Sequence, residues 1–375
     1  MRILQVTSAR AFGGGERHLA DLARGLSGRG HELFVALAEG SPLRERLLFL
    51  PERNVFTLPL RNALDLRGAL KLARLAREKE IEVVHAHVAR DYTLAAFAAR
   101  RAPRARLVIT RHVLFPLSRA HRLALSHVSR VIAVSGAVAR VLRAQKVFAE
   151  DKIRVVENGV GVARFARARA EYESGRDMSS HAPLRVGIVG ELSVLKGQED
   201  FVRAAALVAR RLGGRVEFVV AGEDASRGRQ YRALVEGLVS ELNLSGRVRL
   251  LGEVGEDELA RLLASLDLFV STSRSEAFGM AMVEALACGV PVVATATEGA
   301  REIVEEGVTG LLVPAGDVES LASSITSLLE DDERRRDFGA RALAAARQRF
   351  DVARMVEATE RVYAEAFARA PSPGS

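Results

Sequence analysis

The sequence predicts an α/β protein with two domains, each a parallel sheet covered by helices. The chain has 375 residues, which suits two domains of roughly 150 to 200 residues better than one. Short β-rich runs alternate with longer amphipathic helical runs along most of the chain, and this alternation is typical of parallel sheets with helical crossovers. It breaks once, in the polar and aperiodic stretch 167–182, and then restarts, so we expect a linker there.

The first domain begins with the strand-like run "RILQVTS" at 2–8. Three glycines follow, and then a helical run at 16–30 in which Leu19, Leu22 and Leu26 recur at helical spacing. Further strands are expected at 31–38, 81–87, 105–110 and 130–135, with helical segments between them. We assign residues 1–168 to this domain.

The second domain repeats the pattern after a linker at 169–183, and we assign residues 184–349 to it. Its expected strands are 184–190, 215–222, 247–252, 266–272 and 290–295, and its expected helices are 198–212, 229–242, 257–264 and 279–287. Ligands of open α/β sheets bind beyond the carboxyl ends of the strands. Two such sheets that face each other are therefore expected to enclose a central cleft.

The composition excludes several classes of protein. Apolar runs of about 20 residues are absent, so no transmembrane helix is expected, and the start "MRILQVTS" lacks a signal-peptide layout. We therefore expect a cytoplasmic protein. The single cysteine, Cys288, rules out a disulfide framework and a thiolate metal site, and its apolar neighbours favour a core position.

Charge is distributed unevenly along the chain. Residues 1–150 contain 26 Lys and Arg against 12 Asp and Glu, whereas the remainder contains 29 against 35. A basic first half favours an anionic partner, either a membrane surface, an acidic acceptor or nucleic acid. Nucleic acid is the weakest of these, since no known motif is present and aromatic residues are only 5%. An arginine-rich solvated surface is the plain alternative.

Glycines 13 to 15 separate the first strand from the first helix. Without Cβ atoms, Gly13 and Gly14 allow a ligand to approach the backbone, and the helix N-terminus favours an anion. The spacing is not that of a dinucleotide fingerprint. A tight turn without a ligand is the alternative.

Histidines follow two strands of the first domain. His112 stands at the carboxyl end of the run at 105–110, where it is placed for work in a cleft. His85 and His87 share one face of their strand. Two histidines without a third ligand give little support for a metal site, and we predict none.

Two carboxylates and a lysine stand out in the second domain. Lys196 precedes a helix, where its ammonium could meet a phosphate. In "SEAFGMAMVEALACGVPVV", at 275–293, Glu284 is the only formal charge after Glu276. The segment predicts a helix that starts at Phe278 and Gly279, with free amides at its N-terminus. Glu284 could accept hydrogen bonds from a ribose diol, unless it simply faces solvent.

Several stretches together resemble the retaining two-domain (GT-B) glycosyltransferases of family 4, over nearly the whole chain. They are "GGGERHLADLARGLSGRGHEL", "VVENGV", "SEAFGMAMVEALACGVPVVAT", "GAREIVEEGVTGLLVPAGD" and "RFDVARMVEATERVYAEAF". The third has the two glutamates with seven residues between them. The resemblance implies two Rossmann-like domains, a helix at 350–370 that returns to the first domain, and a tail at 371–375.

The resemblance also implies roles for the residues at matching positions. His112, Glu276 and Lys196 are expected to be catalytic, with His112 and Glu276 on the transferred sugar and Lys196 on the diphosphate. The donor-binding residues are expected to be Gly13, Gly14, Lys196, Phe278, Gly279, Met280 and Glu284. The implied reaction moves a sugar from a nucleotide-diphosphate-sugar to an acceptor hydroxyl with retention of the anomeric configuration. It needs no metal and no other cofactor. From the basic first half we expect the acceptor to be a lipid-linked or cell-envelope glycan at the inner membrane face.

One position departs from the family pattern. Glu191 stands where the family usually has an arginine, and a carboxylate repels a diphosphate. The alternatives are an epimerase or phosphorylase of related fold, or a non-catalytic nucleotide-sugar-binding protein. For the membrane, the run "RHVLFPLSRAHRLALSHVSR" at 111–130 mixes basic and apolar residues as a membrane-facing segment would.

Overall fold

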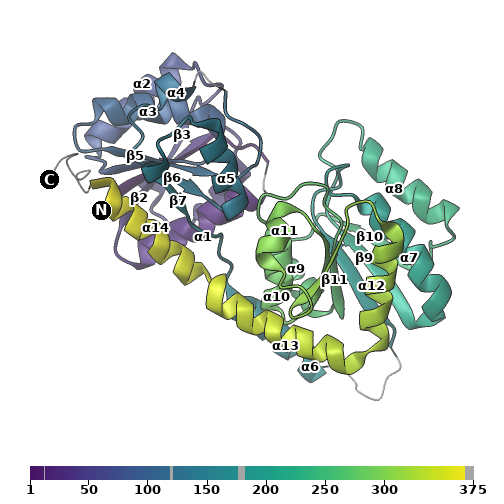
Figure 1. Cartoon of the computed structure of the whole chain (residues 1–375). Coiled ribbons are helices and arrows are strands. Elements are labelled where there is room, and N and C mark those ends of the chain that lie inside the picture. Colours follow the sequence, from purple (N-terminus) through teal and green to yellow (C-terminus); the bar gives the residue numbers. More distant parts are fainter. Residues whose placement is uncertain (12, 119–120, 176–181, 368–375) are drawn as a thin grey trace. The chain divides into compact units, whose positions relative to one another are not determined.

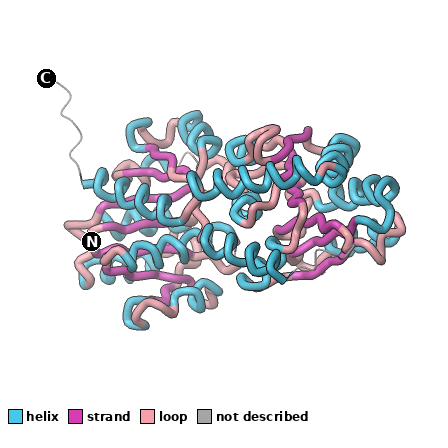
Figure 2. Tube along the Cα trace, turned by 90° about the horizontal axis from the view of Figure 1, so that it is seen from below, coloured by secondary structure: helices cyan, strands magenta, loops and turns pink. Residues whose placement is uncertain are grey.

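The computed structural model describes residues 1–11, 13–118, 121–175 and 182–367 (Figure 1). They divide into two compact units, Met1–Gly159 with the segment from Val352, and Val160–Asp351. Each unit is a parallel sheet flanked by helices (Figure 2), which confirms the predicted α/β class. No helix in the described ranges is long and apolar enough to cross a membrane.

The first unit has a seven-stranded sheet in the order β3-β2-β1-β4-β5-β6-β7, and every neighbouring pair is parallel. The strands are β1 Arg2–Thr7, β2 Glu32–Ala38, β3 Val55–Leu58, β4 Val83–Ala86, β5 Arg106–Arg111, β6 Arg130–Ala133 and β7 Ile153–Val155. The chain runs outward from β1 in one direction and returns to β4 on its other side. The carboxyl ends of β1 and β4 therefore form the topological switch point.

Helices cover both faces of the first sheet (Figure 1). They are α1 Gly14–Gly28, α2 Leu66–Glu78, α3 Tyr92–Arg101, α4 His121–Ala124, α5 Gly136–Gln145 and α14 Val352–Phe367, with short 3₁₀ turns η1 Pro42–Leu47, η2 Glu52–Asn54, η3 Ala89–Asp91 and η4 Glu150–Lys152. On one face, α1 and α14 share a core with the strands that includes Leu22, Val35 and Tyr363. Gly25 permits their close packing, since a Cβ there would collide with Val356.

The second unit has a six-stranded parallel sheet in the order β10-β9-β8-β11-β12-β13. The strands are β8 Leu184–Val189, β9 Val216–Ala221, β10 Val248–Gly252, β11 Leu268–Ser271, β12 Val292–Thr295 and β13 Gly310–Val313. The helices are α6 Val162–Gly175, α7 Gln198–Leu212, α8 Gln230–Glu241, α9 Glu256–Ala264, α10 Met280–Ala287, α11 Glu298–Ile303, α12 Val318–Glu330 and α13 Asp332–Arg349, with η5 Gly213–Arg215. Here the switch point lies between β8 and β11.

The structure differs from the predicted linker. Residues 162–175 form α6, so the loop expected from 169 onward is wrong as far as Gly175, and the division between the units falls at Gly159 rather than at 168. Arg169 ties α6 to the second unit through the carbonyls of Ala264 and Leu266, at 2.8 and 2.9 Å. The helix buries few side chains, which is why no apolar period marked it. The rest of the predicted linker, at 176–181, and the tail lie outside the described residues.

The last helix lies where the resemblance expects it. Within the expected segment 350–370, residues 352–367 form α14, which belongs to the first unit. Its Met355, Val356 and Tyr363 are buried in that unit's core. The chain therefore finishes on the domain in which it began.

Candidate active site

The predicted site residues of the first unit gather at its switch point. The glycine turn follows β1, His87 follows β4, and His112 follows β5, the neighbour of β4. Parallel strands end at the same edge of a sheet, so three segments far apart in sequence meet there. The fold thereby brings the glycine turn to the same edge of the sheet as His87 and His112.

The glycine turn is held by its own helix. Gly13 has an extended backbone, and its N–H donates to Glu16 Oε2 at 3.0 Å. Burial raises the pKa of Glu16, and the hydrogen bonds it accepts partly oppose that rise. An anion at the start of α1 would therefore compete with Glu16 for the amide of Gly13. Gly15 lies next to His112, because a Cβ at Gly15 would be 3.8 Å from His112 Cγ.

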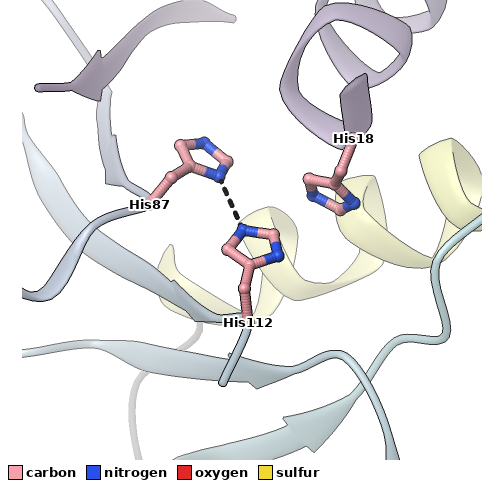
Figure 3. A group of neighbouring side chains, drawn as sticks. All are labelled: His18, His87 and His112. Carbon is pink, nitrogen blue, oxygen red and sulfur yellow. Dashed lines mark hydrogen bonds between the residues drawn. The ribbon is translucent and has the colours of Figure 1, made fainter. Parts of the chain in front are cut away.

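Three histidine rings converge beside this turn (Figure 3). His18 comes from α1, and its ring centroid lies 4.8 Å from that of His112 and 5.8 Å from that of His87. His87 Nδ1 lies 3.4 Å from His112 Nε2. His87 Nε2 lies 2.7 Å from Gln5 Oε1, which can only accept, so this nitrogen carries the proton. From these partners we infer that His112 donates to His87 Nδ1.

A buried hydrogen-bond network continues behind His87. Gln5 Nε2 donates to the hydroxyl of Tyr363 at 3.2 Å, and His85 Nδ1 lies 2.6 Å from the same hydroxyl. His85 Nε2 lies 2.7 Å from Thr110 Oγ1, so both nitrogens of His85 are occupied. The pair formed by His85 and His87 is thus a structural network. Through it, α14 contributes to the position of the His87 ring.

All four buried imidazoles are held in the neutral form. Burial lowers the pKa values of His85, His87 and His112 well below the ordinary value, and the neighbouring rings lower them further. Burial lowers the pKa of His18 to about 4, and the Asn158 side chain partly offsets this effect. His112 is the only one of the four that is partly exposed. It therefore offers a neutral imidazole to a ligand.

The second unit brings Lys196 and Glu276 together at its own switch point. Lys196 lies in the loop after β8 and Glu276 in the loop after β11. Lys196 Nζ donates to Glu276 Oε2 at 2.6 Å, with side chains 33% and 15% exposed. Ser273 Oγ donates to the same oxygen at 3.2 Å. The sequence predicts both residues as members of the site, but it does not predict their ion pair.

A glycine makes this approach possible. Gly197 has φ of +65°, and a Cβ there would lie 2.5 Å from the carbonyl oxygen of Thr272. The hydroxyl of Thr272 donates back to the carbonyl of Lys196 at 2.9 Å. The loops after β8 and β11 can therefore lie in direct contact, which brings the ammonium of Lys196 to the carboxylate of Glu276.

The helix α10 starts where the sequence predicted it. Gly279 caps it with φ of +115°, next to buried Phe278 and half-buried Met280. The first amides of a helix have no intrahelical acceptor, so this end suits an anion. Glu284 is 1% exposed, and the alternative that it faces solvent is therefore wrong. Cys288 is buried as predicted, and burial raises its pKa to about 12.

Glu191 lies in the loop that follows β8. Its side chain is exposed, and its backbone carbonyl accepts a hydrogen bond from Gln198 Nε2 at 2.9 Å. Sequence reasoning missed a nearby cation, Arg274, whose backbone N–H donates to the carbonyl of Leu195 at 2.8 Å. The Arg274 guanidinium pairs with Glu199 Oε1, also at 2.8 Å. Lys196 therefore does not stand alone as a positive charge here.

Two protein-family models match the chain. The model described as Glycosyltransferase Family 4 matches residues 12–164, and the model described as Glycosyl transferases group 1 matches residues 179–344. N-acetyl-alpha-D-glucosaminyl L-malate synthase of Bacillus anthracis is 26% identical over 96% of this chain and 95% of its own length. D-inositol 3-phosphate glycosyltransferase of Nocardia farcinica is 36% identical, but the match covers 52% of this chain and 44% of that relative.

Solved structures share the same architecture. Anabaena Alr3699/HepE in complex with UDP and glucose superposes with a TM-score of 0.81 at 26% identity, covering 96% of this chain and 98% of that one. Sucrose-phosphate synthase from Thermosynechococcus elongatus has a TM-score of 0.78 at 22% identity, covering 98% and 99%. The second likeness is one of fold alone.

Proposed function

We infer that this chain, which belongs to the family 4 and group 1 glycosyltransferases, moves a sugar from a nucleotide-diphosphate-sugar to an acceptor hydroxyl with retention of anomeric configuration. The observation that carries the proposal is the Lys196–Glu276 ion pair at a switch point, at 2.6 Å. An ammonium at that place suits a diphosphate, and a carboxylate suits sugar hydroxyls. An epimerase or a non-catalytic binder agrees less well with the family.

On the donor side, we propose that the second unit supplies the charge stabilisation. Lys196 would pass from Glu276 to the diphosphate, and Glu276 would then accept hydrogen bonds from the sugar. The amides of Phe278, Gly279 and Met280 at the start of α10 would add a positive dipole. These groups supply cationic stabilisation without a metal cofactor. Glu284, on the same helix, would hold the ribose.

On the sugar side, we propose that His112 contacts the transferred residue near the leaving oxygen. Its ring is neutral and partly exposed, and His87 fixes its orientation at 3.4 Å. Because His112 donates its one N–H to His87, its other nitrogen, Nδ1, would accept a hydrogen bond from a hydroxyl of the sugar without placing a full charge beside the reacting centre. Gly13 and Gly14 would let the donor approach the start of α1.

We propose the nucleotide from a structural relative and the acceptor from the charge of the first unit. UDP is the first candidate nucleotide, since it is bound in the HepE structures. The first unit carries 31 Lys and Arg against 17 Asp and Glu, which favours an anionic acceptor. A lipid-linked or cell-envelope glycan at the inner membrane face is the proposed class. Phe115 and Leu123, 66% and 83% exposed, would touch the membrane.

A second candidate acceptor is a small anionic alcohol. The relatives named above carry malate and inositol 3-phosphate in their names, and the basic first unit suits such a molecule equally well. The two candidates differ in one property, since only the first requires a membrane. An acceptor in solution leaves the exposed apolar residues without a role in the reaction.

The donor is tested by a thermal-shift panel of UDP, GDP, ADP and their sugars. A ligand at a hundred times its Kd stabilises by about 2.7 kcal/mol, so the matching base should stand apart, and Glu284→Ala should lose that shift. The membrane is tested by flotation with anionic liposomes at low salt, with a Phe115→Ser/Leu123→Ser variant as the control. Absence of wild-type binding would exclude the membrane acceptor and leave the soluble one.

A further inference from the structure

We propose that His18, His87 and His112 form a binding site for one divalent transition-metal ion of the zinc class. All three belong to the first unit, so the proposal does not depend on the reaction proposed above. From the sequence we predicted no metal, because His85 and His87 share one strand face and no third ligand could be assigned to them. His18 is the third ligand, and it lies on α1, whose sequence has the pattern of an ordinary amphipathic helix.

The distances between the ring nitrogens suit a tetrahedral ion. Ligand nitrogens at about 2.05 Å from zinc lie about 3.4 Å apart at the tetrahedral angle. His87 Nδ1 and His112 Nε2 are already 3.4 Å apart. The potential ligand atoms of the three residues all lie within 4.8 Å of one another. The widest separation has to close by about 1.4 Å, which small side-chain rotations can supply, and Figure 3 shows the rings converging.

His18 is the independent reason to expect a ligand. Its side chain is 1% exposed, and neither ring nitrogen has a hydrogen-bond partner of good geometry within the described structure. Buried polar groups are nearly always partnered, because an unpaired one loses its hydration without replacement. An ion between the three rings would give His18 the partner it lacks. The side chain of Asn158, which raises the pKa of His18, is the alternative partner, but no hydrogen bond between these two side chains has acceptable geometry in the described structure.

The surrounding groups are arranged as around a metal-bound histidine. His87 donates its far N–H to Gln5, at 2.7 Å, and this bond directs Nδ1 toward the cluster. An outer oxygen acceptor of this kind usually fixes the tautomer of a ligating histidine. His85 cannot join, since both of its nitrogens are occupied. Because His112 is partly exposed, we expect water or a small ligand to reach the fourth position on the ion.

The ligand set also predicts which ions bind. Three neutral imidazoles suit Zn²⁺, Co²⁺, Ni²⁺ and Cu²⁺, whereas Mg²⁺ and Ca²⁺ prefer oxygen ligands. We give the ion no role in transfer. If His112 also serves the transferred sugar, the ion and the sugar would compete for one ring, and that consequence alone rests on the proposed function.

The test is direct metal binding by the full chain after treatment with a chelator. Co²⁺ is titrated and followed by its visible absorption, and Zn²⁺ by calorimetry. Wild type should bind one ion. His18→Gln, His87→Gln and His112→Gln should each weaken binding by at least 100-fold, and Gln5→Leu should weaken it by about 10- to 100-fold. His121→Gln and His127→Gln are the matched controls on the same unit and should bind as wild type does.

Melting curves show whether each variant is folded. His112 is partly exposed, so we expect His112→Gln to disturb folding least of the three. Stabilisation by Zn²⁺ in wild type and not in folded His112→Gln supports the site. The absence of one-to-one binding by wild type overturns it. Binding that is lost in the His121 or His127 variants, or that survives in all three cluster variants, also overturns it. None of these readouts uses a donor, so they stand apart from the transferase proposal.

Discussion

Replacing Lys196 by methionine removes the one ammonium at the second switch point and keeps the length of the side chain. In the free chain this breaks a pair at 2.6 Å whose members are 33% and 15% exposed. A charge-assisted hydrogen bond to a diphosphate contributes about 1.5 to 3 kcal/mol. Its loss in the transition state lowers kcat/KM by about 10- to 150-fold. The assay is the initial rate of sugar transfer or donor hydrolysis over a range of donor concentrations.

The matched control is Arg203→Met, which removes an exposed cation from α7, the helix that follows Lys196. It should change kcat/KM by less than twofold. A second variant, Glu276→Gln, removes the other half of the pair, and the double variant should lose less than the product of the two single losses. The reasoning is refuted if Lys196→Met keeps wild-type kcat/KM while remaining folded, or if Arg203→Met falls equally far.

Three further predictions concern stability, each read as the free energy of unfolding in urea. Gly197→Ala should cost about 1 to 3 kcal/mol, since φ of +65° and the Thr272 carbonyl at 2.5 Å both oppose a Cβ; an unchanged midpoint would contradict this. Gly25→Ala should cost about 1 to 3 kcal/mol by overpacking against Val356, and a neutral result would mean that α14 can move away. Burial raises the pKa of Asp91 from 3.8 to about 6, so the folded state holds the proton more tightly, and stability falls as the pH rises from about 4 to 6. Asp91→Asn should remove up to about 3 kcal/mol of this decline, and parallel pH profiles would contradict the assignment.

The architecture was readable from the sequence because each long strand is a compact apolar run followed by an amphipathic helix. What escaped were short or polar elements. The strands β3, β7 and β13 lie at the edges of their sheets and are only partly buried, so they lack the continuous apolar run of the central strands. α6 escaped because only Val162 and Phe165 are buried along it. Its attachment depends on Arg169, whose partners belong to distant parts of the chain.

The candidate site was predictable as a set of loops and not as a set of contacts. His112, Lys196 and Glu276 follow strands, and the carboxyl ends of strands are where ligands bind in such sheets. The pairing of Lys196 with Glu276 depends on β8 lying beside β11, which no local pattern specifies. His18 was missed because it lies within an amphipathic helix, far in sequence from the rings it meets. His18 stands out as a possible ligand only in the structure, where both of its buried ring nitrogens lack a hydrogen-bond partner among the described residues.

The central claim is that the Lys196–Glu276 pair belongs to the donor site of a glycosyltransferase. The most direct measurement is the turnover of a nucleotide-sugar panel by wild type and by Glu276→Ala at matched folded concentration. The account predicts turnover of one nucleotide-sugar by wild type and a fall of at least about 10- to 100-fold for the variant, as expected from the loss of one or two strong hydrogen bonds. Equal rates for the two proteins, with every donor in the panel, would contradict it.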